Sequence, residues 1–219
     1  MNKFRLTATL ALIIINVVVF FVGKMTEHTV LIQGYQGAET TTINIFDIIA
    51  SYSWFTCFQE WQLWRLISYQ FVHATPWHLA FNMWALYIFG PAVEEFFGAR
   101  RFLGFYLTCG VAGALFSSLL AGLGIYYSEA PWQMVRLVGA SASIYGVMVA
   151  VAFLYPHVRV SLLFPPVTMT MRTFAMVVIG IATVVILFNG GNAGGEAGHL
   201  GGIIMGAAIM AFLKRRYRF

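Results

Sequence analysis

Three polar clusters interrupt the long apolar runs of this chain, and together they could perform chemistry. Ser141 is followed four residues later by Tyr145. His78 is followed four residues later by Asn82, and His199 stands in the segment GHLGG. Residues i and i+4 share one face of an α-helix, so each pair would project from a single face. A serine beside a histidine is a nucleophile beside its base, because imidazole can take the hydroxyl proton during attack on a carbonyl and return it to the leaving amine.

The negative oxygen created by such an attack needs hydrogen-bond donors that are already aimed at it. Ser141 is expected about one turn inside the N-terminal end of its helix, so its backbone N–H and the helix dipole could serve. The side chains of His78 and Asn82 could assist. The only aspartate is Asp47, in a loop region, and no acidic residue lies inside an apolar run. The sequence therefore predicts a Ser–His dyad without a carboxylate, with the Tyr145 ring as the candidate for holding the imidazole.

Hydroxyl groups in a membrane helix often have a structural role instead, bonding to their own backbone or to a neighbouring helix. Ser143 is expected to play that part, because two residues turn a helix by ~200° and direct it away from Ser141. Small residues recur every four positions in two runs, an arrangement that lets helix backbones approach closely. They are Ala142, Gly146 and Ala150 in one run and Gly198, Gly202 and Gly206 in the other. If these ribbons face each other, Ser141 and His199 border the same seam.

The composition indicates which elements must position these residues. The chain has 219 residues, of which 60% are hydrophobic and only 10% are charged, and its mean hydropathy is +0.78. We therefore expect an all-α membrane protein with a single domain over residues 1–219. The predicted spans cover residues 6–23, 77–93, 102–122, 137–155, 169–188 and 198–213. The first run has no small-residue cleavage site after it and is expected to be a retained helix. Cys57 and Cys109 do not indicate a disulfide framework.

The basic residues orient this six-helix arrangement, because an even number of spans places both termini on one side. That side is predicted to be the cytoplasm, and the polar ends of spans two, four and six then lie in the outer half of the bilayer. The net charge of +5 follows the membrane edges and does not form a nucleic-acid-binding patch. The short chain favours a bacterial inner membrane. The expected inner residues are Lys3, Arg5, Arg100, Arg101, Arg159, Arg172, Lys214, Arg215, Arg216 and Arg218, against Lys24, Arg65 and Arg136 outside.

Two outer segments complete the expected architecture. Residues 24–76 form the one sizeable external loop, which contains Trp54, Trp61 and Trp64 and is expected to lie along the membrane interface. Within it, Arg65 is expected to make a loop-packing or headgroup contact, with Glu60 as a candidate partner. The glycine-rich segment 189–197 is expected to be mobile and to cover the polar cavity.

Five motifs occur in a fixed order along the chain, and this ordered set resembles the rhomboid family of intramembrane serine proteases. They are WR (Trp64, Arg65), H-x4-H-x3-N (His73, His78, Asn82), G-P-x2-E-x3-G (Gly90 to Gly98), G-A-S-x3-Y-G (Gly139 to Gly146) and H-L-G-G-x3-G (His199 to Gly206).

The resemblance implies a nucleophile at Ser141, a base at His199, and an oxyanion hole that includes His78 and Asn82. It also implies a rhomboid-like six-helix bundle with a membrane-associated first loop and a lateral entrance near the fifth span. The implied substrates are single-pass membrane proteins in the lipid bilayer, whose helix unwinds near its outer end. One position departs from the family pattern, which usually has glycine after the serine. Here it is Ala142, whose methyl group is expected to crowd the seam or the approach of substrate.

Three other interpretations share some of these features. A proteolytically inactive relative that binds membrane proteins would have the same fold but would normally lack the serine or the histidine. A small six-span transporter would carry ionisable pathways or broken helices at the midplane. A metal site could use His73, His78, His199 and Glu196, although no HExxH pair is present. The Ser–His interpretation requires no metal or cofactor, and the sequence carries no signal of an oligomeric state.

Overall fold

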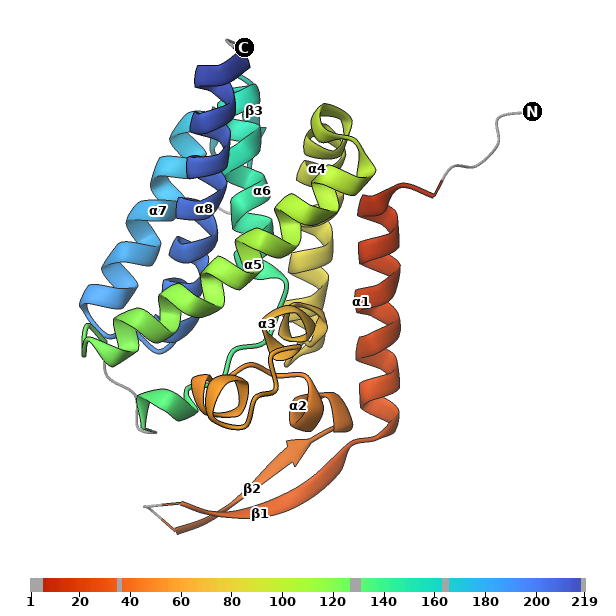
Figure 1. Cartoon of the computed structure of the whole chain (residues 1–219), viewed down its shortest axis with the longest axis vertical. Helices are drawn as coiled ribbons and strands as arrows, with labels where there is room; N and C mark the ends of the chain where they lie inside the picture. The colour runs from red at the N-terminus through yellow and green to blue at the C-terminus, as the bar shows by residue number, and fades with distance from the viewer. Residues whose placement is uncertain (1–5, 35–36, 127–130, 163–165, 218–219) are drawn as a thin grey trace.

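The computed structural model describes residues 6–34, 37–126, 131–162 and 166–217, so Lys3, Arg5 and Arg218 lie outside the described residues. Within those ranges, six helices of 14 residues or more form the body of the protein. Helix α1 begins and helix α8 ends at the same end of the molecule (Figure 1). The six helices are α1 (Ala8–Met25), α4 (Pro76–Phe97), α5 (Ala99–Gly122), α6 (Ser141–Leu154), α7 (Met171–Leu187) and α8 (Ala193–Tyr217).

Three of these helices are long and apolar enough to cross a bilayer: α1, α5 and α8 up to Arg216. Helices α6 and α7 are apolar but shorter. The outer faces of α1 and α7 expose large apolar side chains such as Val18 and Val184, which suits contact with lipid. The protein is therefore an integral membrane protein built mainly from helices.

Helix α6 forms the centre of the bundle, and α8 packs closely along it. Val147 and Ala150 of α6 are completely buried. A Cβ atom placed on Gly202 of α8 would lie 1.9 Å from the carbonyl oxygen of Ala142, and one on Gly206 would lie 2.8 Å from that of Gly146. Only glycine permits these approaches, so the two small-residue ribbons face each other where Gly202 meets Ala142 and Gly206 meets Gly146.

The first external loop is more structured than a chain lying flat on the interface. It begins with an antiparallel hairpin of β1 (His28–Gly34) and β2 (Gly37–Ile43), at the end of the molecule opposite the start of α1 (Figure 1). Four short helical segments follow: α2 (Ile45–Ile49), the π-helix η1 (Phe55–Gln59), α3 (Arg65–Ser68) and the 3-10 helix η2 (Tyr69–Phe71). The exposed indoles of Trp61 and Trp64 are consistent with the predicted interfacial position.

Arg65 makes the loop-packing contact that was expected, but its hydrogen-bond partners do not include Glu60. Its guanidinium donates hydrogen bonds to the carbonyl oxygens of Ser51 and Ile48, at 2.7 and 2.6 Å, and its Nε donates to Gln62. Arg65 is buried, and Glu60 instead accepts a hydrogen bond from Gln62. The guanidinium group has five N–H donors in a fixed planar geometry and can bond several carbonyl groups at once. This explains why an arginine stabilises this turn.

Several predicted helix boundaries were wrong: α4 continues to Phe97 and α8 to Tyr217, past the predicted ends at 93 and 213. The starts of α6 and α8 also differ. Helix α6 begins at Ser141 rather than near residue 137, because Leu137 forms a backbone bridge with Tyr52 and Gly139 has a φ of +114°. Helix α8 begins at Ala193, so part of the segment expected to be a mobile cover is its first turn. The remaining elements are η3 (Trp132–Met134) and the antiparallel pair β3 (Arg159–Ser161) and β4 (Thr168–Thr170).

Candidate active site

Ser141 and His199 are within hydrogen-bonding distance. The Oγ atom of Ser141, the first residue of α6, lies 2.8 Å from Nε2 of His199 in the second turn of α8. The His199 side chain is only 12% exposed. The close α6–α8 seam brings together two residues that are 58 positions apart in sequence. A neutral imidazole with its proton on Nδ1 accepts a hydrogen bond from the serine hydroxyl at this position, which is the geometry of a nucleophile and its base.

Tyr145 holds the plane of the imidazole. It lies one turn after Ser141 on α6, and its ring stacks on the His199 ring with centroids 4.1 Å apart and planes inclined by 13°. This contact places Tyr145 beside His199, and its supporting role remains a prediction. Stacking fixes the tilt of the ring but supplies no hydrogen-bond acceptor to its Nδ1 atom.

A carboxylate, which the sequence interpretation did not place at this site, completes the constellation. Glu196 Oε2 lies 2.9 Å from Nδ1 of His199. The two residues are three positions apart, a spacing that brings side chains together on a helix. This signal was present in the sequence, but the surrounding glycines led to the prediction of a mobile loop, so Glu196 was considered only as a metal ligand.

The segment before Ser141 is fixed by the first loop. The Gly139 N–H donates to the Tyr69 carbonyl at 2.9 Å. A Cβ atom on Gly139 would lie 2.6 Å from Cε1 of His78, and the φ of +114° is also unsuited to other residues. His78 therefore borders the start of α6. The N–H groups of the first helical turn have no partner within the helix, which leaves that of Ser141 available to an anion.

Asn82 is less directly connected to the site. Its amide Nδ2 donates to the His78 carbonyl, one turn earlier on α4, at 3.0 Å, and its side chain is buried. Within the part of the chain that the structure describes, no recorded contact joins Asn82 to Ser141 or His199. Its predicted place in an oxyanion hole remains a prediction.

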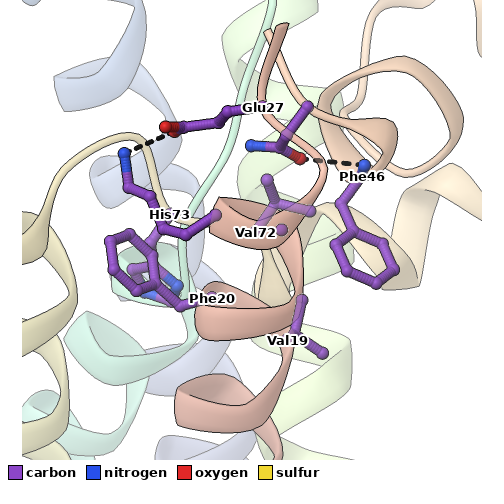
Figure 2. Close-up of a pocket in the computed structure, with 9 residues that line it drawn as sticks. Val19, Phe20, Glu27, Phe46, Val72 and His73 are labelled. Atoms are coloured by element: carbon purple, nitrogen blue, oxygen red, sulfur yellow. Dashed lines mark hydrogen bonds and ion pairs between the residues drawn. The ribbon is translucent and has the colours of Figure 1, made fainter.

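The His73 ring packs against the His78 ring. Their ring centroids lie 5.0 Å apart in an edge-on arrangement. Figure 2 shows His73 among the residues of a small pocket, which also include Phe20 and the ion-paired Lys24 and Glu27. Burial, and then the neighbouring His78, lower the pKa of His73 to about 3. His73 is therefore an uncharged neighbour of His78 at neutral pH.

The comparisons with known proteins agree with this geometry. A family profile described as the Rhomboid domain matches residues 60–216. The chain belongs to the rhomboid family.

Three relatives illustrate the range of this rhomboid's similarity. Rhomboid protease AarA of Providencia stuartii is 26% identical over 211 residues, which cover 92% of this chain and 70% of that protein. Rhomboid protease GlpG of Haemophilus influenzae is 28% identical over 160 residues, with 73% and 74% covered. Rhomboid-like protease 3 of Toxoplasma gondii is 27% identical over 159 residues, which cover 72% of this chain and 54% of that protein. This rhomboid therefore spans about half the length of the Toxoplasma relative.

The two residues that follow the serine both point away from the seam. Ser143 is fully buried, and its hydroxyl donates to Gln70 Oε1 at 2.8 Å, as expected of a structural serine. The methyl group of Ala142 faces Gly113 of α5, because a Cβ atom on Gly113 would lie 2.5 Å from it. The seam with α8 is formed by the carbonyl of Ala142 and not by its methyl group. The Ala142 methyl group therefore does not crowd the α6–α8 seam as expected, because it packs against Gly113 of α5.

The proposed metal ligands do not come together. In the residues that the structure describes, no three His, Cys, Asp or Glu side chains form a group that could hold an ion. His73 packs against His78, whereas Glu196 contacts His199. The geometry gives the metal hypothesis no support.

Proposed function

We propose that this rhomboid is an intramembrane serine endopeptidase, which cleaves the membrane-spanning segments of membrane-anchored proteins near the outer face of the bilayer. The observation that carries the proposal is the 2.8 Å contact between Ser141 Oγ and His199 Nε2, at the start of a helix. Both residues needed for covalent catalysis are present and correctly arranged, which favours an enzyme over an inactive binder of membrane proteins.

The reaction follows from the positions of the side chains. As Ser141 Oγ attacks the scissile carbonyl carbon, its proton passes to His199 Nε2 and a tetrahedral oxyanion forms. The Ser141 N–H at the positive end of α6 stabilises this oxyanion, with His78 and Asn82 as further donors. His199 then gives its proton to the leaving amine, and the C–N bond breaks. Water, deprotonated by the same nitrogen, attacks the acyl-enzyme and releases the carboxylate product, and the proton returns to Ser141.

The proposed topology supplies the required water. If the basic residues place both termini in the cytoplasm, α6 begins in the outer half of the bilayer. The first loop, which contacts the segment before Ser141, then lies on the outer side. We propose single-pass proteins as substrates, since an isolated helix can unwind at its outer end and present an extended peptide bond to Ser141. A bacterial inner membrane suits this arrangement.

The test is covalent labelling by a serine-reactive fluorophosphonate, together with cleavage of a single-pass reporter in liposomes. Ser141→Ala should abolish labelling and reduce cleavage by at least about 10⁴-fold, because the nucleophile is lost. Ser143→Ala is the matched control and should retain both, since its hydroxyl is directed to Gln70.

A folded wild-type chain that neither labels nor cleaves would contradict the endopeptidase and favour the inactive binder. Labelling that persists in Ser141→Ala but disappears in Ser143→Ala would show that Ser143, and not Ser141, is the nucleophile.

A further inference from the structure

The carboxylate of Glu196 has an orientation that suggests a role in catalysis. It contacts Nδ1 of His199, while Nε2 on the opposite side of the ring contacts Ser141. We infer that Glu196 is a positioning residue, which holds His199 in the tautomer and orientation that accept the serine proton. The inference rests on the proposed function, since it concerns the same histidine.

The tautomer of His199 follows from the hydrogen-bonding capacity of each group. Nε2 can accept the Ser141 proton only if the neutral ring carries its own proton on Nδ1. An ionised carboxylate accepts hydrogen bonds and donates none, so the contact with Glu196 favours the Nδ1–H form. During attack the Ser141 proton moves to Nε2, the Nδ1 proton stays on the ring, and Glu196 remains an anion beside the imidazolium.

The turn that carries Glu196 is held in place. Its backbone N–H donates to the Asn192 carbonyl at 2.9 Å. Two residues earlier, the Gly194 carbonyl accepts a hydrogen bond from Ser117 Oγ of α5 at 2.9 Å. Ala197 is completely buried, and the Glu196 side chain is only 17% exposed. Glu196 is therefore part of a docked helix turn, unlike a freely rotating surface side chain.

Other groups near the imidazole do not duplicate this contact. Tyr145 stacks on the face of the ring, which controls tilt but not proton position. His78 approaches from α4 and borders Gly139. Among the described residues, Glu196 is the acceptor recorded at Nδ1, so the choice of tautomer depends on it.

The kinetic test compares Glu196→Gln with Glu95→Gln, the same change at an exposed position on α4. Asparagine in place of the buried aspartate of a serine-protease triad costs ~10⁴-fold in kcat. Tyr145 still holds the ring here, so Glu196→Gln should lower kcat by about 10²-fold with KM little changed. Glu196→Asp, which keeps the anion on a shorter stem, should recover part of the loss. Glu95→Gln should match the wild type.

A second measurement makes the result independent of activity. In chains carrying Ser141→Ala and ¹⁵N-labelled histidine, the ring nitrogen shifts should report an Nδ1–H tautomer for His199 when Glu196 is present. Glu196→Gln should give a mixture, because an amide can donate to Nδ1 as well as accept from it.

The outcomes separate the inference from the proposed function. An active wild type, with kcat and tautomer both unchanged in Glu196→Gln, would overturn the role of Glu196 and leave the protease intact. An inactive wild type in which Glu196→Gln still changes the tautomer would overturn the protease and leave the positioning role. If Glu196→Gln fails to fold, Glu196→Ala decides the question: a mixed tautomer with lowered kcat supports the inference, and an unchanged tautomer with wild-type kcat overturns it.

Discussion

The α6–α8 seam and the first external loop both position Ser141, but they are built by opposite means. The seam, formed by Ala142, Gly146, Gly202 and Gly206, brings the two helix backbones into direct contact. The first loop, residues 26–75, is instead held by side chains that reach backbone carbonyls. The seam sets the distance from Ser141 to His199, whereas the loop fixes the chain just before Ser141.

The loop's connections differ from each other in chemistry. Arg65 donates to two carbonyl groups, the Trp64 indole N–H donates to the Ile49 carbonyl at 3.0 Å, and the Ser68 hydroxyl donates to that of Ala50 at 2.9 Å. Repeated small residues create a seam, but no repeated pattern creates this loop. The seam should therefore fail by steric overlap and the loop by loss of individual hydrogen bonds.

The largest expected effect comes from adding one methyl group to the seam. Gly202→Ala would place a Cβ atom 1.9 Å from the Ala142 carbonyl oxygen, so α6 and α8 must separate. Overpacking a rigid core costs about 1–3 kcal/mol or more, and a backbone contact relaxes poorly. We expect at least about 3 kcal/mol of destabilisation and loss of cleavage, measured by thermal unfolding in detergent and by reporter assay.

The matched control is Gly180→Ala on α7, where an added Cβ atom meets nothing within 4 Å. That variant should be neutral or slightly stabilised, because alanine favours helix by about 1 kcal/mol over glycine. Equal effects of the two changes would contradict the close packing of the seam.

The same contrast explains what the sequence could predict. Hydrophobic runs and the four-residue spacing of small residues are periodic. The long helices, the seam and the proximity of Ser141 to His199 could therefore be predicted from the sequence. The start of α6 was predicted too early, because an apolar run does not record that Leu137 pairs with a distant Tyr52. The β1–β2 hairpin and the carbonyl contacts of Arg65 were missed, since they depend on partners with no fixed sequence spacing. Glu196 was missed as a partner of His199 because glycines weaken the local helix signal.

The next largest effect is expected in the loop, on removing the charge of Arg65. Arg65→Met keeps the apolar stem but leaves the carbonyl groups of Ser51 and Ile48 without their donor. Buried unsatisfied polar groups cost about 1–3 kcal/mol each, so we expect a loss of about 2–4 kcal/mol in the free energy of unfolding. Arg136→Met is the control, because that side chain is half exposed. It donates to the Asp47 carbonyl at 3.0 Å and to the Ser51 hydroxyl at 3.2 and 3.3 Å, and its ion pair with Asp47 spans 3.7 Å. Arg136→Met should lower the free energy of unfolding by less than about 1 kcal/mol. A larger loss than for Arg65→Met would contradict the different weights given to the buried and the exposed arginine.

Acid should weaken the loop through His73. The pKa of His73 is about 3 in the folded chain, and the ordinary value for histidine is 6.5. Between these two pH values, His73 therefore binds a proton in the unfolded chain that it does not bind in the folded chain. The free energy of unfolding therefore falls as pH decreases through this window, by up to about 1.4 kcal/mol per pH unit. His73→Phe keeps a ring but cannot titrate, so its unfolding temperature should drop less than that of the wild type between about pH 7 and about pH 5. His157→Phe, at an exposed position, should retain the wild-type dependence. A wild-type slope in His73→Phe would show that His73 does not titrate on unfolding.

The smallest expected effect distinguishes the two sides of Ala142, whose carbonyl touches the seam and whose methyl group touches α5. Ala142→Gly keeps the carbonyl, so cleavage should change by less than about threefold, with a stability loss of about 1 kcal/mol from helix propensity. Gly113→Ala should be more harmful, because its Cβ atom would lie 2.5 Å from the Ala142 methyl and 2.7 Å from the Gly198 carbonyl. The double variant removes only the first of these overlaps, so a double-mutant cycle of unfolding free energies should show partial rescue. A tenfold gain of activity in Ala142→Gly would instead mean that the methyl group obstructs substrate, and that the α5 contact alone does not account for alanine after the serine.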